Sequence, residues 1–204
     1  MNYKKIRVPY LDNKDIDRIV EQFREKFWDN KVPVDIEYII EIKLKIGIVP
    51  IPDFLRIVGI DALIASNWQT LYVDNDEYMN ERRYNRLRFS LTHEIGHYVL
   101  HKEIYASFNV KSFDDYYKLN EDIPYEQYGY LETQANKFAN YLLVPRKILK
   151  IERSKLLEKV KEDFKKVNIE KLNSYLAIPL SEVFEVSDEV VAIALNDLNY
   201  KELG

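Results

Sequence analysis

The segment His93-Glu94-Ile95-Gly96-His97 decides how this chain is interpreted. Residues four apart on an α-helix differ by roughly 40° in azimuth and about 6 Å in rise, so both imidazoles can bind one metal ion. Zinc accepts imidazole nitrogen and keeps a position for water when three protein ligands bind. Glu94 lies beside the first ligand, where it can act as a general base. Chance would supply this pattern about 0.004 times in such a chain, which disfavours two unrelated surface histidines.

Two residues are candidates for the third metal ligand. His101 continues the same helical stripe, but another turn adds about 6 Å, so three successive histidines do not easily meet one tetrahedral ion. Glu132 is the better candidate, because Ala135 and Ala139 on the same face would let its helix approach closely. As a carboxylate in the first turn of its helix it could also interact favourably with the helix dipole, and this role is compatible with binding a metal. Asn136 shares this face and could hydrogen-bond a ligand.

The composition excludes several classes of protein. The 204 residues are 47% hydrophobic and 31% charged, as in one soluble globular domain. No apolar run approaches the roughly 18 residues of a membrane span, and residues 1–10 lack a signal-peptide pattern, so we expect no membrane association. The absence of cysteine excludes thiolate sites and fits a reducing compartment. A net charge of −4 argues against direct nucleic-acid binding.

Periodicity and end signals predict helices joined by a few short strands. We expect a helix with its N-cap at Asn13, and others over residues 35–47, 80–102 and 131–144. Strands are expected over residues 48–51, 57–65 and 68–73. Pro50 places the first strand at an edge, and the other two form an antiparallel hairpin around Ser66-Asn67. Residues 102–130, with six tyrosines, are expected to be irregular, either lining a cleft or packing on themselves.

The last third of the chain divides by charge. Residues 146–171 carry ten Lys/Arg against five Asp/Glu, whereas residues 172–204 carry one lysine against six acids. The two stretches could pair or simply be solvated helix faces. Residues 176–198 have the rhythm of a helix–turn–helix but no lysine or arginine, and phosphates repel an acidic helix. We interpret them as a packing element rather than a DNA-binding one.

Several motifs taken together resemble the ImmA/IrrE family of metallopeptidases. The resemblance rests on residues 88–101, on Glu132-x-x-Ala135-Asn136-x-Phe138-Ala139, and on residues 142–145. The β-rich segment ending at residues 70–74 also looks like that family, so the resemblance covers roughly residues 15–148. The chain departs from some relatives because it lacks a recognisable N-terminal helix-turn-helix domain.

The resemblance implies an α+β fold, with a compact thermolysin-like core and a small, mostly antiparallel sheet on the active-site helix. This core would span residues 1–148, and residues 149–204 would form a helical extension packed on it. By carry-over, His93, His97 and Glu132 bind one Zn²⁺ ion and Glu94 is the catalytic base. Family members act in the cytoplasm on protein substrates, and the expected substrate is a helix-turn-helix repressor. The sequence does not specify an oligomeric state.

Some assignments stay open at this stage. His101 could support a ligand, face the substrate or be structural, and either His101 or a tyrosine of residues 102–130 could stabilise the oxyanion. Imidazole and carboxylate ligands also suit iron and manganese. The main alternative function is a zinc-containing regulator that binds a transcription factor without cutting it. Glu94 argues against this alternative, because a structural zinc site needs no base.

Overall fold

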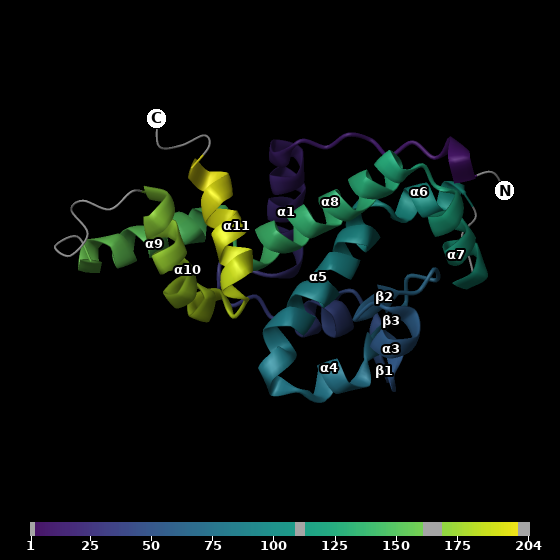
Figure 1. Ribbon diagram of the computed structural model, residues 1–204, viewed down its shortest axis with the longest axis horizontal. Coiled ribbons are helices and arrows are strands. Elements are labelled where there is room, and N and C mark those ends of the chain that lie inside the picture. Colours follow the sequence, from purple (N-terminus) through teal and green to yellow (C-terminus); the bar gives the residue numbers. More distant parts are fainter. Residues whose placement is uncertain (1–2, 109–112, 161–168, 200–204) are drawn as a thin grey trace.

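The computed structural model describes residues 3–108, 113–160 and 169–199, and most of them are helical (Figure 1). Two long helices, α5 (Tyr84–Leu100) and α8 (Tyr125–Leu143), cross the centre of the molecule. The sheet lies to one side with α3 (Phe54–Val58) and α4 (Asn75–Met79). At the other end lie α9 (Arg146–Val160), α10 (Ile169–Phe184) and α11 (Asp188–Asn199). The expected α+β fold with a helical C-terminal region is confirmed.

The remaining helical elements precede the sheet or connect the long helices. They are α1 (Asn13–Phe27), α2 (Ile36–Tyr38), α6 (Lys102–Ser107) and α7 (Phe113–Asp122), with 3₁₀ turns at Tyr3–Lys5 and Glu81–Arg83 and a π-helical turn at Ile39–Lys43. No helix within the described ranges combines the length and apolar character needed to cross a membrane.

The described residues form a three-stranded sheet in the order β1-β3-β2. Its strands are β1 (Gly47–Ile51), β2 (Ala62–Ile64) and β3 (Thr70–Asp74). The hairpin of β2 and β3 is antiparallel as expected, but β1 pairs with β3 in parallel. The prediction of a mostly antiparallel sheet was therefore wrong. Parallel pairing needs a long crossover, and α3 with β2 provides it between β1 and β3. Pro50 lies in the edge strand β1, as predicted.

The predicted strand over residues 57–65 was too long. Its first part belongs to α3, and only Ala62–Ile64 is extended. Gly59 ends α3 at a positive φ of 83°, and its N–H bonds to the Leu55 carbonyl. This left-handed cap is a standard way to end a helix, and it turns the chain toward β2.

Residues 102–108 and 113–130 are mostly helical rather than irregular, so that expectation was also wrong. They form α6, α7 and the start of α8, within the part of the chain that the structure describes. A second hydrophobic cluster explains the difference, because side chains of this segment pack against the N-terminus. Its buried members are Tyr3, Ile6, Val8, Tyr105, Leu119, Ile123 and Leu131. Contacts so distant in sequence leave no local periodic signal.

Two predicted helix ends moved. Asp12, not Asn13, is the N-cap of α1, because its side chain accepts hydrogen bonds from the Lys14 and Asp15 N–H groups. Gly47 does not end the second helix. That helix ends with the π-helical turn at Lys43, and Gly47 begins β1.

One hydrophobic cluster joins the sheet, the central helices and the C-terminal helices. Leu71 of β3, Leu91 of α5 and Phe138 of α8 share it with Phe184 of α10 and Leu195 of α11, all of them fully buried. Residues 176–198 are therefore a packing element, as interpreted from the sequence. The division of the chain at residue 148 stays a prediction.

The charged C-terminal stretches pair only in part. Arg146 of the basic stretch lies 3.2 Å from Asp197 of the acidic stretch, whereas Lys155 pairs with Glu152 of its own helix. Residues 161–168 and 200–204 of these stretches lie outside the described residues.

Helices α5 and α8 pack closely at Gly96, where the backbone of α5 lies against Ala135 and Phe138 of α8. A Cβ atom at this position would lie 3.0 Å from the Ala135 Cα, 3.1 Å from the Ala135 carbonyl oxygen and 3.3 Å from the Phe138 Cβ. Glycine costs helix stability relative to alanine, so its presence is explained by this approach. The contact brings the residues after His93 on α5 and those around Glu132 on α8 to one site.

Candidate metal centre

Three nitrogen and oxygen donors from α5 and α8 converge on one point. The Nε2 atoms of His93 and His97 lie 3.0 Å apart. From α8, Glu132 places Oε2 3.3 Å from the His93 Nε2 and Oε1 3.5 Å from the His97 Nε2. Donors bound to tetrahedral zinc at about 2.0–2.1 Å stand roughly 3.3 Å apart. Two imidazoles and a carboxylate at these separations fit a catalytic zinc ion with a position left for water.

Hydrogen bonds orient both imidazoles. The His93 Nδ1 lies 2.9 Å from the Asn136 Oδ1, which only accepts, so Nδ1 carries the proton and Nε2 keeps its lone pair. Asn136 therefore occupies the supporting position expected from its place beside Glu132. Burial alone would lower the pKa of His93, but the Glu132 hydrogen bond and the charges of Glu94 and Glu132 outweigh it and raise that pKa.

His97 is held by a buried chain of hydrogen bonds that leads to the N-terminal segment. The Pro9 carbonyl accepts from the Gln134 Nε2 at 2.8 Å, which leaves the Gln134 Oε1 to accept from the His101 Nε2 at 3.1 Å. The His101 Nδ1 then accepts from the His97 Nδ1 at 3.0 Å. In this chain from Pro9 to His97 every donor has an acceptor, so the lone pair of the His97 Nε2 is free to bind a metal.

This chain places His101 behind the metal centre. Its side chain is fully buried, so it does not face a substrate. Burial lowers the pKa of His101 to about 4, which keeps the ring neutral and its Nδ1 an acceptor. Burial, together with the charges of His93 and His101, also lowers the pKa of His97 well below its usual range.

Glu94 lies beside the three donors and lines the same pocket. Only 7% of the residue is exposed, and its Oε2 accepts a 2.8 Å hydrogen bond from the Ile64 N–H at the edge strand β2. Burial raises the pKa of Glu94 to about 7, against the opposing influence of His93. A carboxylate with a pKa near neutrality is suited to accept and return a proton.

The pocket at the metal centre has a volume of about 320 Å³ and includes a tyrosine of residues 102–130 that the sequence did not single out among the six there. Tyr128 lines it from α8, one turn before Glu132. Burial, and then the charges of Glu132 and Glu94, raise the pKa of Tyr128, so it keeps its hydroxyl proton at neutral pH. Tyr128, Glu132 and Asn136 are spaced by four residues, and this stripe is the signal that could have singled out Tyr128.

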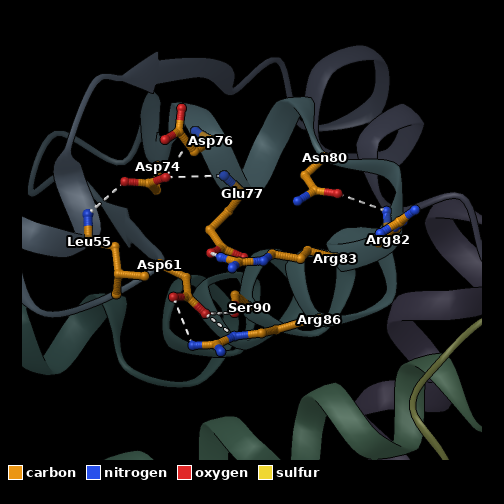
Figure 2. A network of polar contacts seen from close by, with 10 residues as sticks. All are labelled: Leu55, Asp61, Asp74, Asp76, Glu77, Asn80, Arg82, Arg83, Arg86 and Ser90. Carbon is orange, nitrogen blue, oxygen red and sulfur yellow. Dashed lines mark hydrogen bonds and ion pairs between the residues drawn. The ribbon is translucent and has the colours of Figure 1, made fainter.

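Part of a network of polar contacts, drawn in Figure 2, lies at the rim of the pocket. Asp61 accepts from the Arg86 Nε at 2.7 Å and from its Nη2 at 3.0 Å, and the Ser90 hydroxyl lies 3.4 Å from the same carboxylate. All three residues line the pocket. Asp61 precedes β2 in a loop, without a motif that could have identified it in the sequence.

The same network fixes the turn between the sheet and α5. Asp74 at the end of β3 accepts from the N–H groups of Leu55, Asp76 and Glu77, and so caps α4 (Figure 2). Glu77 is buried and pairs with Arg83 just before α5. These contacts fix the position at which α5, which carries His93 and His97, begins relative to the sheet.

Comparison with known proteins connects this geometry to a family. No match to a curated protein was found. Residues 78–196 match the Peptidase M78 family, described as the IrrE N-terminal-like domain. The match runs from α4 through α11 and contains His93, Glu94, His97 and Glu132. It differs in range from the resemblance seen in the sequence, because it leaves out residues 15–77, with the β-rich segment, and includes the C-terminal helices. Because the match spans more than half of the chain, this protein belongs to the Peptidase M78 family of IrrE-like metallopeptidase domains.

Proposed function

We propose that this protein is a zinc-dependent peptidase with a thermolysin-like arrangement of its site. The observation that carries the proposal is the convergence of His93, His97 and Glu132 next to a buried carboxylate, Glu94, in an open pocket. A closed structural site would have no use for a base at this position. Zinc held by these three side chains would supply a Lewis acid that lowers the pKa of water toward about 7.

The residues of the chain divide the remaining work. Glu94, held by the Ile64 N–H, accepts a proton from the attacking water and gives it to the amine leaving group. Tyr128 keeps its proton and lines the pocket, so it can donate to the oxyanion that forms on the scissile carbonyl. Arg86, fixed by Asp61, provides a positioned cation at the rim.

The pocket also offers a place for an extended peptide. Among the residues that the structure describes, strand β2 pairs with β3 alone, and Ala62 of β2 lines the pocket. An edge strand beside a catalytic pocket can bind a substrate by adding a strand, so that backbone groups give affinity and side-chain pockets give selectivity. This supports a polypeptide substrate over a small molecule.

We further propose that the substrate is a helix-turn-helix repressor in the cytoplasm. The repressor comes from the family resemblance, and a chain without cysteine fits a reducing compartment. In this proposal the protein acts on its protein partner without binding nucleic acid or a membrane.

Substitution of Glu94 tests the peptidase proposal. Glu94→Gln keeps the size of the side chain but removes the base, so zinc content should be unchanged while cleavage falls about 10³-fold. The substrates to assay are helix-turn-helix repressors encoded beside this chain, with fragments identified by mass spectrometry. Glu126→Gln, an exposed change on α8, serves as the matched control. Full cleavage by the zinc-loaded Glu94→Gln variant would refute the proposed base, and a stable complex without fragments would favour the regulator.

A further inference from the structure

A second cavity lies beside the metal pocket, between α5 and α8. It has a volume of about 720 Å³ and lies between the first half of α5, the second half of α8 and α11. It shares Arg86, Phe89, Ser90 and Asn136 with the metal pocket. We call this cavity the α11 groove. The shared residues place the groove directly beside the metal pocket.

The α11 groove has walls that are fixed in place. Asn140 of α8 donates from Nδ2 to the Val190 carbonyl of α11 at 2.9 Å, and Asn85 of α5 donates to the Val186 carbonyl at 3.3 Å. These side chains tie both ends of the α10–α11 turn to the helices that carry the metal centre. A site formed before its ligand arrives avoids the cost of ordering its own walls.

The middle of the groove is apolar. Phe89, Val190 and Ile193 line it, and Ile193 is 52% exposed although its neighbours Val191 and Leu195 are fully buried. Four charged residues also line the groove, and three of them have partners. Lys137 donates to the Asn13 side chain. Arg86 is held by Asp61, and Asp197 accepts from the Tyr141 hydroxyl at 3.0 Å. An occupant of the middle therefore gains most from an apolar side chain.

The geometry of α8 gives the distance from the metal centre. Asn140 follows Glu132 by eight residues, which corresponds to about 12 Å along the helix axis. An extended peptide advances about 3.3 Å per residue, so this distance corresponds to about four substrate residues, with a margin of one residue on either side.

We propose that the α11 groove binds the substrate polypeptide on one side of the scissile bond, and that it selects a bulky apolar side chain three to five residues from that bond. This inference rests on the proposed peptidase function. It adds a specificity-determining surface, of which Ile193 is the most exposed apolar part, and it gives the C-terminal helix α11 a role in choosing the substrate.

Substitution of Ile193 tests the proposal. The full chain, loaded with zinc, is incubated with a proteome-derived mixture of peptides 12–20 residues long, and the products are sequenced by mass spectrometry. We expect the wild type to enrich apolar residues at one position three to five residues from the cleavage site, and Ile193→Lys to reduce that enrichment at least fivefold. Lysine is compatible with the fold here, because Glu189 and Asp197 lie four residues away on either side.

Ile178→Lys is the matched control. Ile178 is 60% exposed on the neighbouring helix α10, has an acid four residues later, and lines neither cavity. It should keep the wild-type profile within twofold. An unchanged profile in Ile193→Lys, or the same loss in Ile178→Lys, would overturn the groove proposal.

A capture experiment separates this inference from the peptidase proposal. The Glu94→Gln protein, immobilised and zinc-loaded, captures peptides from the same mixture. A double variant that carries both Glu94→Gln and Ile193→Lys should lose the enrichment of apolar residues among the captured peptides. If the wild type cleaves nothing but capture still depends on Ile193, the groove stands and the peptidase proposal fails. If Ile193→Lys instead abolishes a concentration-dependent dimer seen by sedimentation, the occupant is a second copy and the substrate groove is wrong.

Discussion

The two sides of the metal centre are held in different ways. On the closed side, His97 bonds to His101, which bonds to Gln134 and through it to the Pro9 carbonyl. On the open side, His93 has the exposed Asn136 as its supporting acceptor. The side chain of His93 is 15% exposed and that of His97 7%.

The closed side is a continuous piece of the protein interior, whereas the open side faces solvent and substrate. The side chains of His97, His101 and Gln134 are buried, so these polar groups have no water to replace a lost partner. On the open side water can replace a lost hydrogen bond at little cost. We therefore expect the precision of metal binding to depend mainly on the closed side, and turnover and substrate selectivity to depend mainly on the open side.

The largest effect should come from the open side, at Tyr128. If this hydroxyl stabilises the oxyanion, Tyr128→Phe should lower kcat about 10²–10³-fold, or about 3–4 kcal/mol, with little change in zinc affinity. Tyr130→Phe, another partly exposed tyrosine of α8, is the control. Steady-state kinetics on a cleaved peptide and a chelator competition for zinc provide the two readouts. A fall in zinc affinity as large as the fall in kcat would assign Tyr128 to the support of the metal instead.

Next in size is the difference between His101 and Asn136. His101→Leu leaves the His97 Nδ1–H and the Gln134 Oε1 buried without partners, which should cost about 2 kcal/mol of unfolding free energy. It should also weaken zinc binding about 10–100-fold, because the orientation of His97 is lost. Asn136→Leu should cost less than about 1 kcal/mol, since the site is exposed.

Denaturant unfolding of the metal-free proteins and chelator competition check this pair of predictions. Unfolding reports the cost of unpaired groups, and the competition reports the cost to zinc binding. Equal losses in the two variants would mean that the closed and open sides are equivalent, and the comparison would fail.

A third substitution disturbs the close packing of α5 against α8 at Gly96, on which both sides of the metal centre depend. Gly96→Ala places a Cβ atom 3.0 Å from the Ala135 Cα, and a helix backbone cannot yield as a flexible side chain can. The strain should outweigh the gain of about 1 kcal/mol in helix propensity, for a net loss of about 1–2 kcal/mol. Thermal and denaturant unfolding measure the loss, with Gly129→Ala as the control because no atom lies within 4 Å of its Cβ position. A more stable Gly96→Ala protein would show that α5 and α8 separate easily.

The features that the sequence predicted are those with a local signal. The spacing of His93 and His97 is written in one helical turn, Gly96 implied a close neighbour, and Pro145 marked the end of α8. The start of α8 was missed by six residues, and Glu132 lies in its interior rather than its first turn. The true beginning follows Pro124, inside the segment that packs on the N-terminus.

What sequence reasoning missed depends on contacts between distant residues. The place of His101 behind His97 follows from Gln134 and Pro9, and the rim depends on Asp61 meeting Arg86 across 25 positions. The parallel pairing of β1 with β3 is likewise a property of the folded sheet. No periodicity or motif predicts such long-range contacts, because they form only when the hydrophobic clusters pack.

The smallest effect concerns Asp74, the cap of α4, and its dependence on pH. Burial would raise the pKa of Asp74, but hydrogen bonds from the N–H groups of Leu55, Glu77 and Asp76 lower it below its usual value. A carboxylate with a lowered pKa in the folded state stabilises the fold at neutral pH, and this contribution disappears as the pH falls below about 4. Asp74→Asn, which can still cap α4, should therefore cost about 1 kcal/mol at pH 7 and much less at pH 3.

Denaturant unfolding of both proteins at the two pH values measures this difference. Asp76→Asn, a change at the exposed neighbour that makes no hydrogen bond to Leu55, is the matched control and should show little dependence on pH. Because the hydrogen bonds of Asp74 go to Leu55, Asp76 and Glu77 and not to a histidine, zinc affinity at pH 7 should change less in Asp74→Asn than in His101→Leu. A cost that persists undiminished at pH 3 would mean that Asp74 acts through packing rather than charge, and a large loss of zinc affinity would mean that the cap of α4 positions the histidines as firmly as the closed side does.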